Sequence, residues 1–149
     1  HAGRLPGVYT PAFVVNGTSW RPRSMLNHQP HLVLPSVGNL KLTVSDKSID
    51  VSFTSKTNNM GNLKLHIALL GMGLITKIEA GENRGRLSQH EFVVLSHDQY
   101  KVSSRDGTTY RWQLDGFSAT PRVAPGYAIV SWVTPQNSME PIQAVGSPL

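Results

Sequence analysis

Apolar and polar residues alternate with a period of two over much of the chain, as they do in β-strands that bury one face. The pattern is clearest over residues 39–45 and recurs over 48–54 and 62–70. We expect these three strands to lie side by side in a meander. Further strands of the same kind are predicted at 74–80, 91–97, 108–114 and 126–134.

The spacing of these strands and of the turns between them predicts a mainly β fold, an antiparallel β-sandwich or barrel, over residues 37–149. Residues 1–36 differ, because a single apolar strand at 13–15 is followed by the turn pair Asn16-Gly17 and then by a polar connector with several prolines. We therefore place a boundary after residue 36.

The five-residue sequence at 38–42 returns at 61–65. A repeat protein needs several units with one period, so the match indicates two strands that are entered in similar ways.

Composition excludes several classes of function. Hydrophobic residues make up 39% of the chain, which is enough for a core, but no stretch approaches the roughly 20 apolar residues of a membrane span. The net charge of +5 comes from basic residues scattered singly, whereas a nucleic-acid surface has a clustered basic stripe. Because the chain has no cysteine, it cannot contain a disulfide, a thiolate metal site or a cysteine nucleophile.

The segment Tyr9-Thr10-Pro11 leads into the apolar strand at 13–15. A Thr-Pro step in this position resembles the cis-proline loop of thioredoxin folds, which faces the bound substrate chain. A trans proline that opens a strand explains the same residues when they are taken alone.

Two later segments extend the resemblance: residues 81–87 followed by 90–95, and residues 141–146 near the end. Together with the Tyr9-Thr10-Pro11 loop, their order resembles a family of bacterial exported thioredoxin-like proteins known mainly as a domain of unknown function. The resemblance covers nearly the whole chain. It implies an N-terminal thioredoxin-like domain with a Cys-x-x-Cys motif, then a β-rich C-terminal region, and a periplasmic or extracellular location.

The dithiol-bearing region of that family has no counterpart in this sequence. The resemblance therefore makes residues 1–36 the end of a thioredoxin-like domain plus a connector, with Tyr9, Thr10 and Pro11 as a peptide-facing edge. We do not expect this chain alone to be an enzyme. We expect the missing half, or another protein, to dock against it.

The segment 81–86 is the strongest motif of the β region, since its two glycines suit a tight turn with positive φ angles. Arg84 and Arg86 could hold a carboxylate or phosphate, with Glu82 orienting one of them. Alternatively, the turn braces an interface, which we favour because no second catalytic group is near in sequence. The candidate residues for an anion site or an interface are Glu82, Asn83, Arg84, Arg86 and His90.

The histidines do not predict a metal site, and no cofactor is expected. His28 and His31 are separated by a proline, which disfavours the helix that would align them. We interpret His66, His90 and His97 as surface residues of strands. A copper site at His1 would require it to be a native N-terminus, and the resemblance places it in mid-protein.

The tryptophans fit a β fold with a partner. Trp112 and Trp132 lie in predicted strands and are expected in or at the edge of the core. Trp20 lies in the connector and is expected to pack against another domain or subunit.

Three functions follow from these patterns. The first is a non-catalytic β module of an exported thioredoxin-like protein that docks with a dithiol-bearing half or another protein. The second is a structural subunit of an extracellular or periplasmic assembly, a homo-oligomer whose open strand edges are filled by neighbouring chains. The third is a copper-binding protein centred on His1, or a carbohydrate-binding protein.

Overall fold

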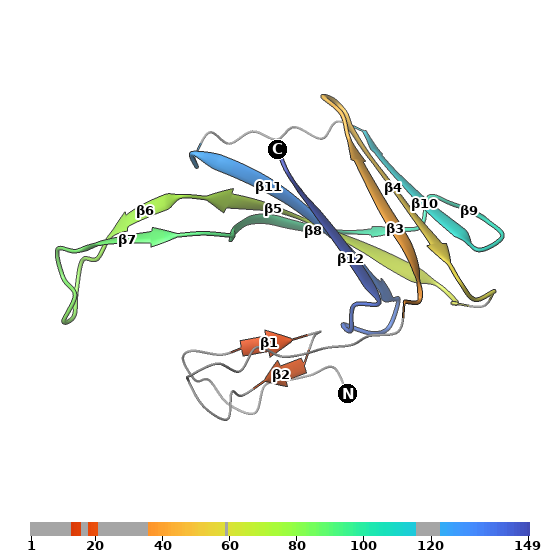
Figure 1. The fold of residues 1–149 in the computed structure, drawn as a ribbon, viewed down its shortest axis with the longest axis horizontal. Helices are drawn as coiled ribbons and strands as arrows, with labels where there is room; N and C mark the ends of the chain where they lie inside the picture. Colours follow the sequence, from red (N-terminus) through yellow and green to blue (C-terminus); the bar gives the residue numbers. More distant parts are fainter. Residues whose placement is uncertain (1–12, 16–17, 21–35, 59, 116–122) are drawn as a thin grey trace.

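A computed structural model of the chain describes residues 13–15, 18–20, 36–58, 60–115 and 123–149. Over these residues every strand pairing is antiparallel and no helix is present, which confirms the predicted mainly β fold (Figure 1). Within the same residues no helix is long and apolar enough to cross a membrane.

Two four-stranded sheets form the body of the molecule. The first has the order β3-β4-β10-β9, with bounds Gly38–Val44, Ser48–Ser55, Thr109–Asp115 and Ser104–Asp106. The second has the order β12-β11-β5-β8, with bounds Gln143–Pro148, Gly126–Pro135, Leu63–Met72 and Val93–Lys101. Two hairpins complete the fold: β1 (Phe13–Val15) with β2 (Thr18–Trp20), and β6 (Leu74–Lys77) with β7 (Leu87–His90).

The inward faces of the two large sheets form one apolar core. Alternate residues of each strand point inward, as the period-two pattern requires. The largest side chains that are fully buried there include Trp112, Tyr110, Phe53, Ile49, Leu65 and Ile129. The expectation that Trp112 belongs to the core is confirmed. Burying each such side chain stabilises the fold by roughly 1.5–3 kcal/mol.

The predicted meander of the first three strands is wrong. β3 and β4 do pair, but the second neighbour of β4 is β10, with Trp112 opposite Val51. β5 lies in the other sheet between β11 and β8. It is buried on both faces, whereas β3 is exposed on one. Alternation of apolar and polar residues identifies a strand and its inward face, but it does not indicate which strand pairs with it.

The repeated sequence at 38–42 and 61–65 serves two different local geometries. At Gly38 an added Cβ would lie 2.5 Å from the carbonyl oxygen of Thr54 and 2.6 Å from the ring of Phe53, so no side chain fits. Gly61 has open space around it but a φ of 65°, which glycine adopts most readily. The glycines that begin the two segments are thus needed for different reasons, the first for space and the second for its φ angle. This is expected for a sequence match that is not a structural repeat.

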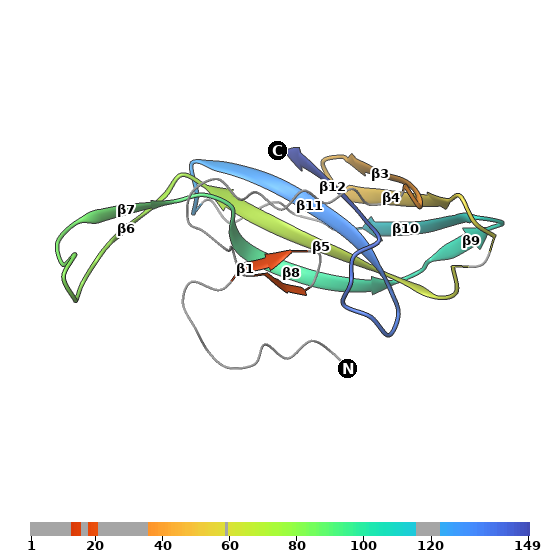
Figure 2. The same ribbon diagram turned by 60° about the horizontal axis from the view of Figure 1, so that its bottom comes forward.

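The hairpin of β6 and β7 projects from the body of the molecule. β5 continues into β6 and β7 continues into β8, so a single long hairpin runs from the centre of the second sheet to a free tip (Figures 1 and 2). Gly73 with φ 67° and Phe92 with φ 55° mark the bend between the two halves, and the register of β5 with β8 shifts at Leu69/Leu70. We call residues 74–90, with β6, β7 and the connection between them, the arm.

Candidate functional site

One face of the arm carries two large apolar side chains that are open to solvent, Ile75 and Leu87, beside Lys77 and Gln89. Leu74 turns back toward the sandwich, because its Cδ1 lies 2.6 Å from the position of a Cβ at Gly71. Side chains alternate along a strand, so Ile75 lies on the opposite face. Ile75 pairs with Gln89, and Lys77 with Leu87, which places Ile75 and Leu87 diagonally on that face. Ile75 is 64% exposed and Leu87 70%.

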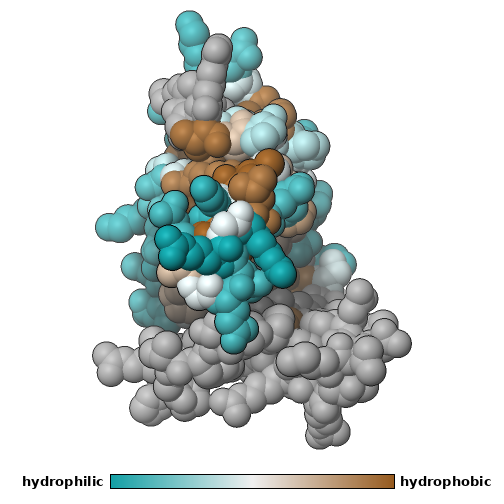
Figure 3. Space-filling model, turned by 90° about the vertical axis from the view of Figure 1, so that its left-hand side faces the viewer, coloured by the Kyte–Doolittle hydropathy of each residue, from teal (hydrophilic) through white to brown (hydrophobic). Residues whose placement is uncertain are grey.

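Two further exposed apolar side chains lie at the base of the arm. Phe92 is 65% exposed and Val94 60%, and Val94 is paired with Leu70 at the edge of the second sheet. Seen along the arm from its free end, hydrophilic surface lies in front and apolar surface lies behind it (Figure 3). We call Ile75, Leu87, Phe92 and Val94 the apolar strip. Large apolar groups exposed together mark interaction sites more often than those scattered singly do.

The predicted turn forms the tip of the arm. Gly81 and Gly85 have φ angles of 80° and 86°, which confirms the expected positive values. The amide of Arg84 donates to the carbonyl of Gly81 at 3.1 Å, and the amide of Gly85 donates to that of Ile78 at 2.8 Å. The turn is thus closed by backbone hydrogen bonds, and its charged side chains face solvent.

The side chains of the turn are arranged differently from the anion site that the sequence suggested. The Arg86 guanidinium donates through Nη1 to Oδ1 of Asn83 at 3.1 Å, so Asn83 rather than Glu82 orients it. Glu82 and Arg84 are exposed. His90 lies at the other end of β7, where its Nε2 is 2.8 Å from Oγ1 of Thr76. The tip therefore gathers four of the five candidate residues and leaves His90 at the base of the arm.

The N-terminal candidates remain predictions. Tyr9, Thr10 and Pro11 lie outside the described residues, as do His1, His28 and His31. The strand at 13–15 and its hairpin are confirmed, since β1 pairs with β2 and Val15 is opposite Thr18.

A second cluster lies on the outer face of the second sheet, around His66. In β5, His66 is directly opposite Trp132 of β11 and is next to Gln99 of β8. It is only 1% exposed, so the interpretation of His66 as a surface residue is wrong. The period-two pattern correctly put it on the face away from the core, but aromatic and hydroxyl side chains of the neighbouring strands close over that face.

The cluster is held by hydrogen bonds and ring contacts. Nδ1 of His66 lies 3.1 Å from Nε2 of His97, and Nε2 of His66 lies 3.2 Å from Oγ1 of Thr134. A neutral imidazole has one N–H, so His66 donates to one of these partners and accepts from the other. The Trp132 ring is nearly parallel to both imidazoles, with centroids 4.9 Å from His66 and 5.1 Å from His97.

The protonation state of His66 follows from this environment. Burial, and then the charges of His97 and Lys64, lower its pKa from 6.5 to about 4. His66 is therefore a neutral imidazole at pH 7, while His97 remains exposed at the edge strand β8. Trp132 is half-buried on the outer face, at the edge of the packed region as expected.

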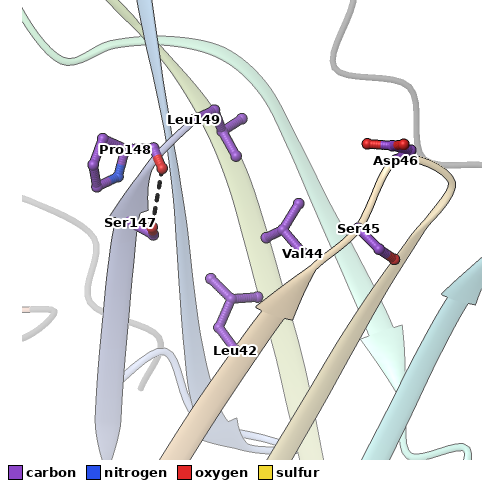
Figure 4. A pocket seen from close by; sticks show the side chains of 7 residues that line it. All are labelled: Leu42, Val44, Ser45, Asp46, Ser147, Pro148 and Leu149. Carbon is purple, nitrogen blue, oxygen red and sulfur yellow. Dashed lines mark hydrogen bonds between the residues drawn. The ribbon is translucent and has the colours of Figure 1, made fainter.

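A pocket of about 500 Å³ opens between the edge strands β3 and β12. Leu42 and Val44 point into it from β3, and the last residues of β12 lie opposite them, with Ser45 and Asp46 at the rim (Figure 4). Among the described residues that line this pocket, Asp46 is the only acidic side chain and no histidine is present. Across the described ranges, no group of three or more His, Cys, Asp or Glu side chains gathers as a metal site would require.

Comparison with solved structures gives two matches. HBP35 of Porphyromonas gingivalis is 15% identical with a TM-score of 0.52, over 75% of this chain and 40% of that chain. The chain thus spans about two fifths of that protein, and the likeness concerns the fold alone. A β-glucuronidase from glycoside hydrolase family 2 is 17% identical with a TM-score of 0.36, over 76% of this chain and 11% of that one.

No curated protein matches the chain. A family profile described as "Protein of unknown function (DUF1223)" matches residues 1–133. Since the match spans most of the sequence, the chain belongs to the DUF1223 family, a family of unknown function.

Proposed function

We propose that this chain is a non-catalytic β-sandwich module that docks a protein partner through the apolar strip on its arm and the base of the arm. The observation that carries the proposal is the exposure of Ile75, Leu87, Phe92 and Val94, each at least 60% open to solvent along one hairpin. Burying an apolar side chain of this size contributes roughly 1.5–3 kcal/mol. A partner that covers several of them gains part of this free energy for each one, against the cost of association.

The backbone of the arm supports the same role. β6 and β7 pair only with each other among the described strands, so each has one edge without a neighbour. A partner strand can add to such an edge through main-chain hydrogen bonds, while the apolar strip gives selectivity. The exposed turn at 81–86 adds charged groups at the tip and fits the interface role better than an anion site.

The partner that the family resemblance favours is a dithiol-bearing thioredoxin-like domain, in a periplasmic or extracellular setting. This chain has no cysteine, so its own part in any thiol chemistry is limited to binding. In this proposal Tyr9, Thr10 and Pro11 belong to the edge that meets the same partner.

Binding of the thioredoxin-like domain of a longer family member, expressed as a separate chain, tests the proposal. Ile75→Asp and Leu87→Asp are each expected to raise the Kd at least about tenfold, or about 1.4 kcal/mol. Asn39→Asp, at an exposed position of β3, is the matched control and should leave the Kd unchanged. Equal affinity for all four proteins, measured by calorimetry, would exclude the arm as the docking element.

A structural subunit is the second candidate, favoured by the charges of the arm and its base. Residues 74–94 contain three basic residues (Lys77, Arg84, Arg86) and three acidic ones (Glu79, Glu82, Glu91), whereas the whole chain carries +5. Two arms therefore do not repel each other, and their strips and edges can pair. Sedimentation velocity separates the candidates, since a concentration-dependent oligomer that Ile75→Asp abolishes supports assembly, and a monomer at all concentrations supports docking.

A further inference from the structure

We propose that Glu91 is the positioning residue of the apolar strip, because its carboxylate fixes the bend at which the arm leaves the sandwich. The purpose of this role rests on the proposed docking function, whereas the fixed bend itself can be measured without a partner. Three features of the bend support the assignment: a gap in strand pairing, the hydrogen bonds of the Glu91 carboxylate, and the backbone conformation of Phe92.

The pairing of the long hairpin is interrupted at the bend. β5 and β8 stop pairing with each other at Gly71 and Val93, and the pairing of β6 with β7 begins at Leu74. Residues 72–73 and 91–92 lie between these pairs and are not paired with each other. Ladder hydrogen bonds therefore do not fix the angle between the arm and the sandwich, so other contacts must fix it.

The Glu91 carboxylate crosses this gap. Its Oε2 accepts a hydrogen bond from the backbone amide of Gly73 at 2.8 Å, which joins the two strands where ladder bonds are missing. Its Oε1 accepts one from Nε2 of Gln89, also at 2.8 Å. Gln89 is paired with Ile75, so the hydrogen bonds run from the apolar strip to the bend. Hydrogen bonds that a carboxylate accepts are shorter and stronger than those between neutral groups.

Phe92, the next residue, has a backbone conformation that bulky side chains avoid. Its φ of 55° is the one positive value at a residue other than glycine within the described ranges. The residue is 65% exposed, so burial in the core does not offset the strain. Strained backbone of this kind persists where neighbouring contacts hold it, and it is frequent where ligands bind. The hydrogen bond between Glu91 and Gly73 is a contact of this kind, and it holds the Phe92 ring in its place on the strip.

Packing on the other strand of the bend is the competing explanation. Cδ1 of Leu74 lies 2.6 Å from the position of a Cβ at Gly71, and Pro125 lies 3.5 Å from that of a Cβ at Gly73. Neither contact involves Glu91. If packing alone fixed the arm, loss of the Glu91 carboxylate would leave the direction of the arm unchanged.

The distance between two spin labels measures the direction of the arm. Because the chain has no cysteine, Glu82→Cys at the tip and Asn39→Cys on β3 give a single labelled pair at exposed positions. We expect one narrow distance distribution, and one about twofold broader when Glu91→Ala is added, since the bend then opens locally. Glu79→Ala removes another exposed carboxylate of the arm and is the control, for which the width should not change.

Glu91→Gln separates hydrogen bonding from the size of the side chain. Its amide oxygen can still accept from Gly73, but its NH₂ group meets the donating NH₂ group of Gln89, so one of the two hydrogen bonds returns. The width should then lie between those of the unaltered bend and Glu91→Ala. The proposal is overturned if Glu91→Ala leaves the distribution as narrow as before, because packing then fixes the arm.

Calorimetry with the thioredoxin-like domain tests what the fixed bend is for. Glu91→Ala should raise the Kd about fivefold, because the strip is no longer preorganised. A broader distance distribution with an unchanged Kd would overturn the positioning role. A failure of the docking function itself shows elsewhere, since Ile75→Asp would then bind as tightly as the unaltered chain.

Discussion

The two halves of one long hairpin have opposite surroundings. β5 is buried at nearly every position, with β11 and β8 on its two sides, whereas β6, its direct continuation, is exposed at three of four positions. Both segments are rich in apolar residues. Apolar content therefore does not by itself locate the core. Leu65 is fully buried and stabilises the fold, whereas the side chain of Ile75 is largely exposed to solvent.

The largest effect on stability is expected from a substitution in the buried strand β5. Leu65→Ala removes a side chain with no exposed surface from the centre of the core, so it should lower the free energy of unfolding by about 2–5 kcal/mol. Urea denaturation followed by circular dichroism measures the loss. A change below about 1 kcal/mol would mean that the two large sheets do not pack as described.

A smaller effect comes from pH and again concerns the buried half. Above pH 6.5 His66 is neutral in both the folded and unfolded chain, but between 6.5 and about 4 only the unfolded chain takes up its proton. The free energy of unfolding should therefore fall by up to about 3 kcal/mol as the pH drops through this window, with no further loss from this group below it. His66→Gln should flatten that part of the profile, and an unchanged slope would contradict the burial of the imidazole.

The next largest effect on stability is expected from a substitution at the bend between β5 and β6. Gly73 has a φ of 67°, so Gly73→Ala should cost about 1–2 kcal/mol in backbone strain, since Pro125 at 3.5 Å leaves room for the methyl group. Gly126→Ala is the control, because its nearest neighbour is also at 3.5 Å and its φ is not positive. If both variants melt alike, Gly73 is not needed for the bend.

The smallest effect on stability is expected in the exposed half. Ile75→Ala should change the free energy of unfolding by less than about 0.5 kcal/mol, because the side chain is 64% exposed. The same variant should still weaken docking of the thioredoxin-like domain. A loss of more than about 1.5 kcal/mol would show that Ile75 contributes to the core and would sharpen the boundary between the two halves.

Much of the fold could be predicted, because the alternation of apolar and polar residues indicates where strands lie. The segments 39–45, 48–54 and 126–134 match β3, β4 and β11 closely, and Trp112 was expected in the core. The arrangement of strands could not be predicted. The pairing of Trp112 with Val51 joins segments about 60 residues apart, and neither segment contains a signal that indicates its partner strand.

The candidate sites were predicted in part for the same reason. The turn at 81–86 is local, so its two glycines indicated positive φ angles from the sequence alone. The cluster of His66, His97 and Trp132 comes from three strands, and only the register brings it together. The resemblance to exported thioredoxin-like proteins, the boundary after residue 36 and the role of Tyr9, Thr10 and Pro11 stay predictions.

The arm is attached to the sandwich through two paired strands, since β6 and β7 continue β5 and β8. A segment joined by one flexible linker would sample many orientations and lose them on binding. On the docking proposal, the paired attachment makes the arm preorganised, so less conformational entropy opposes binding and more of the apolar contact appears as affinity. The docking proposal therefore predicts a higher affinity for the attached arm than for the same contact surface on a flexible linker.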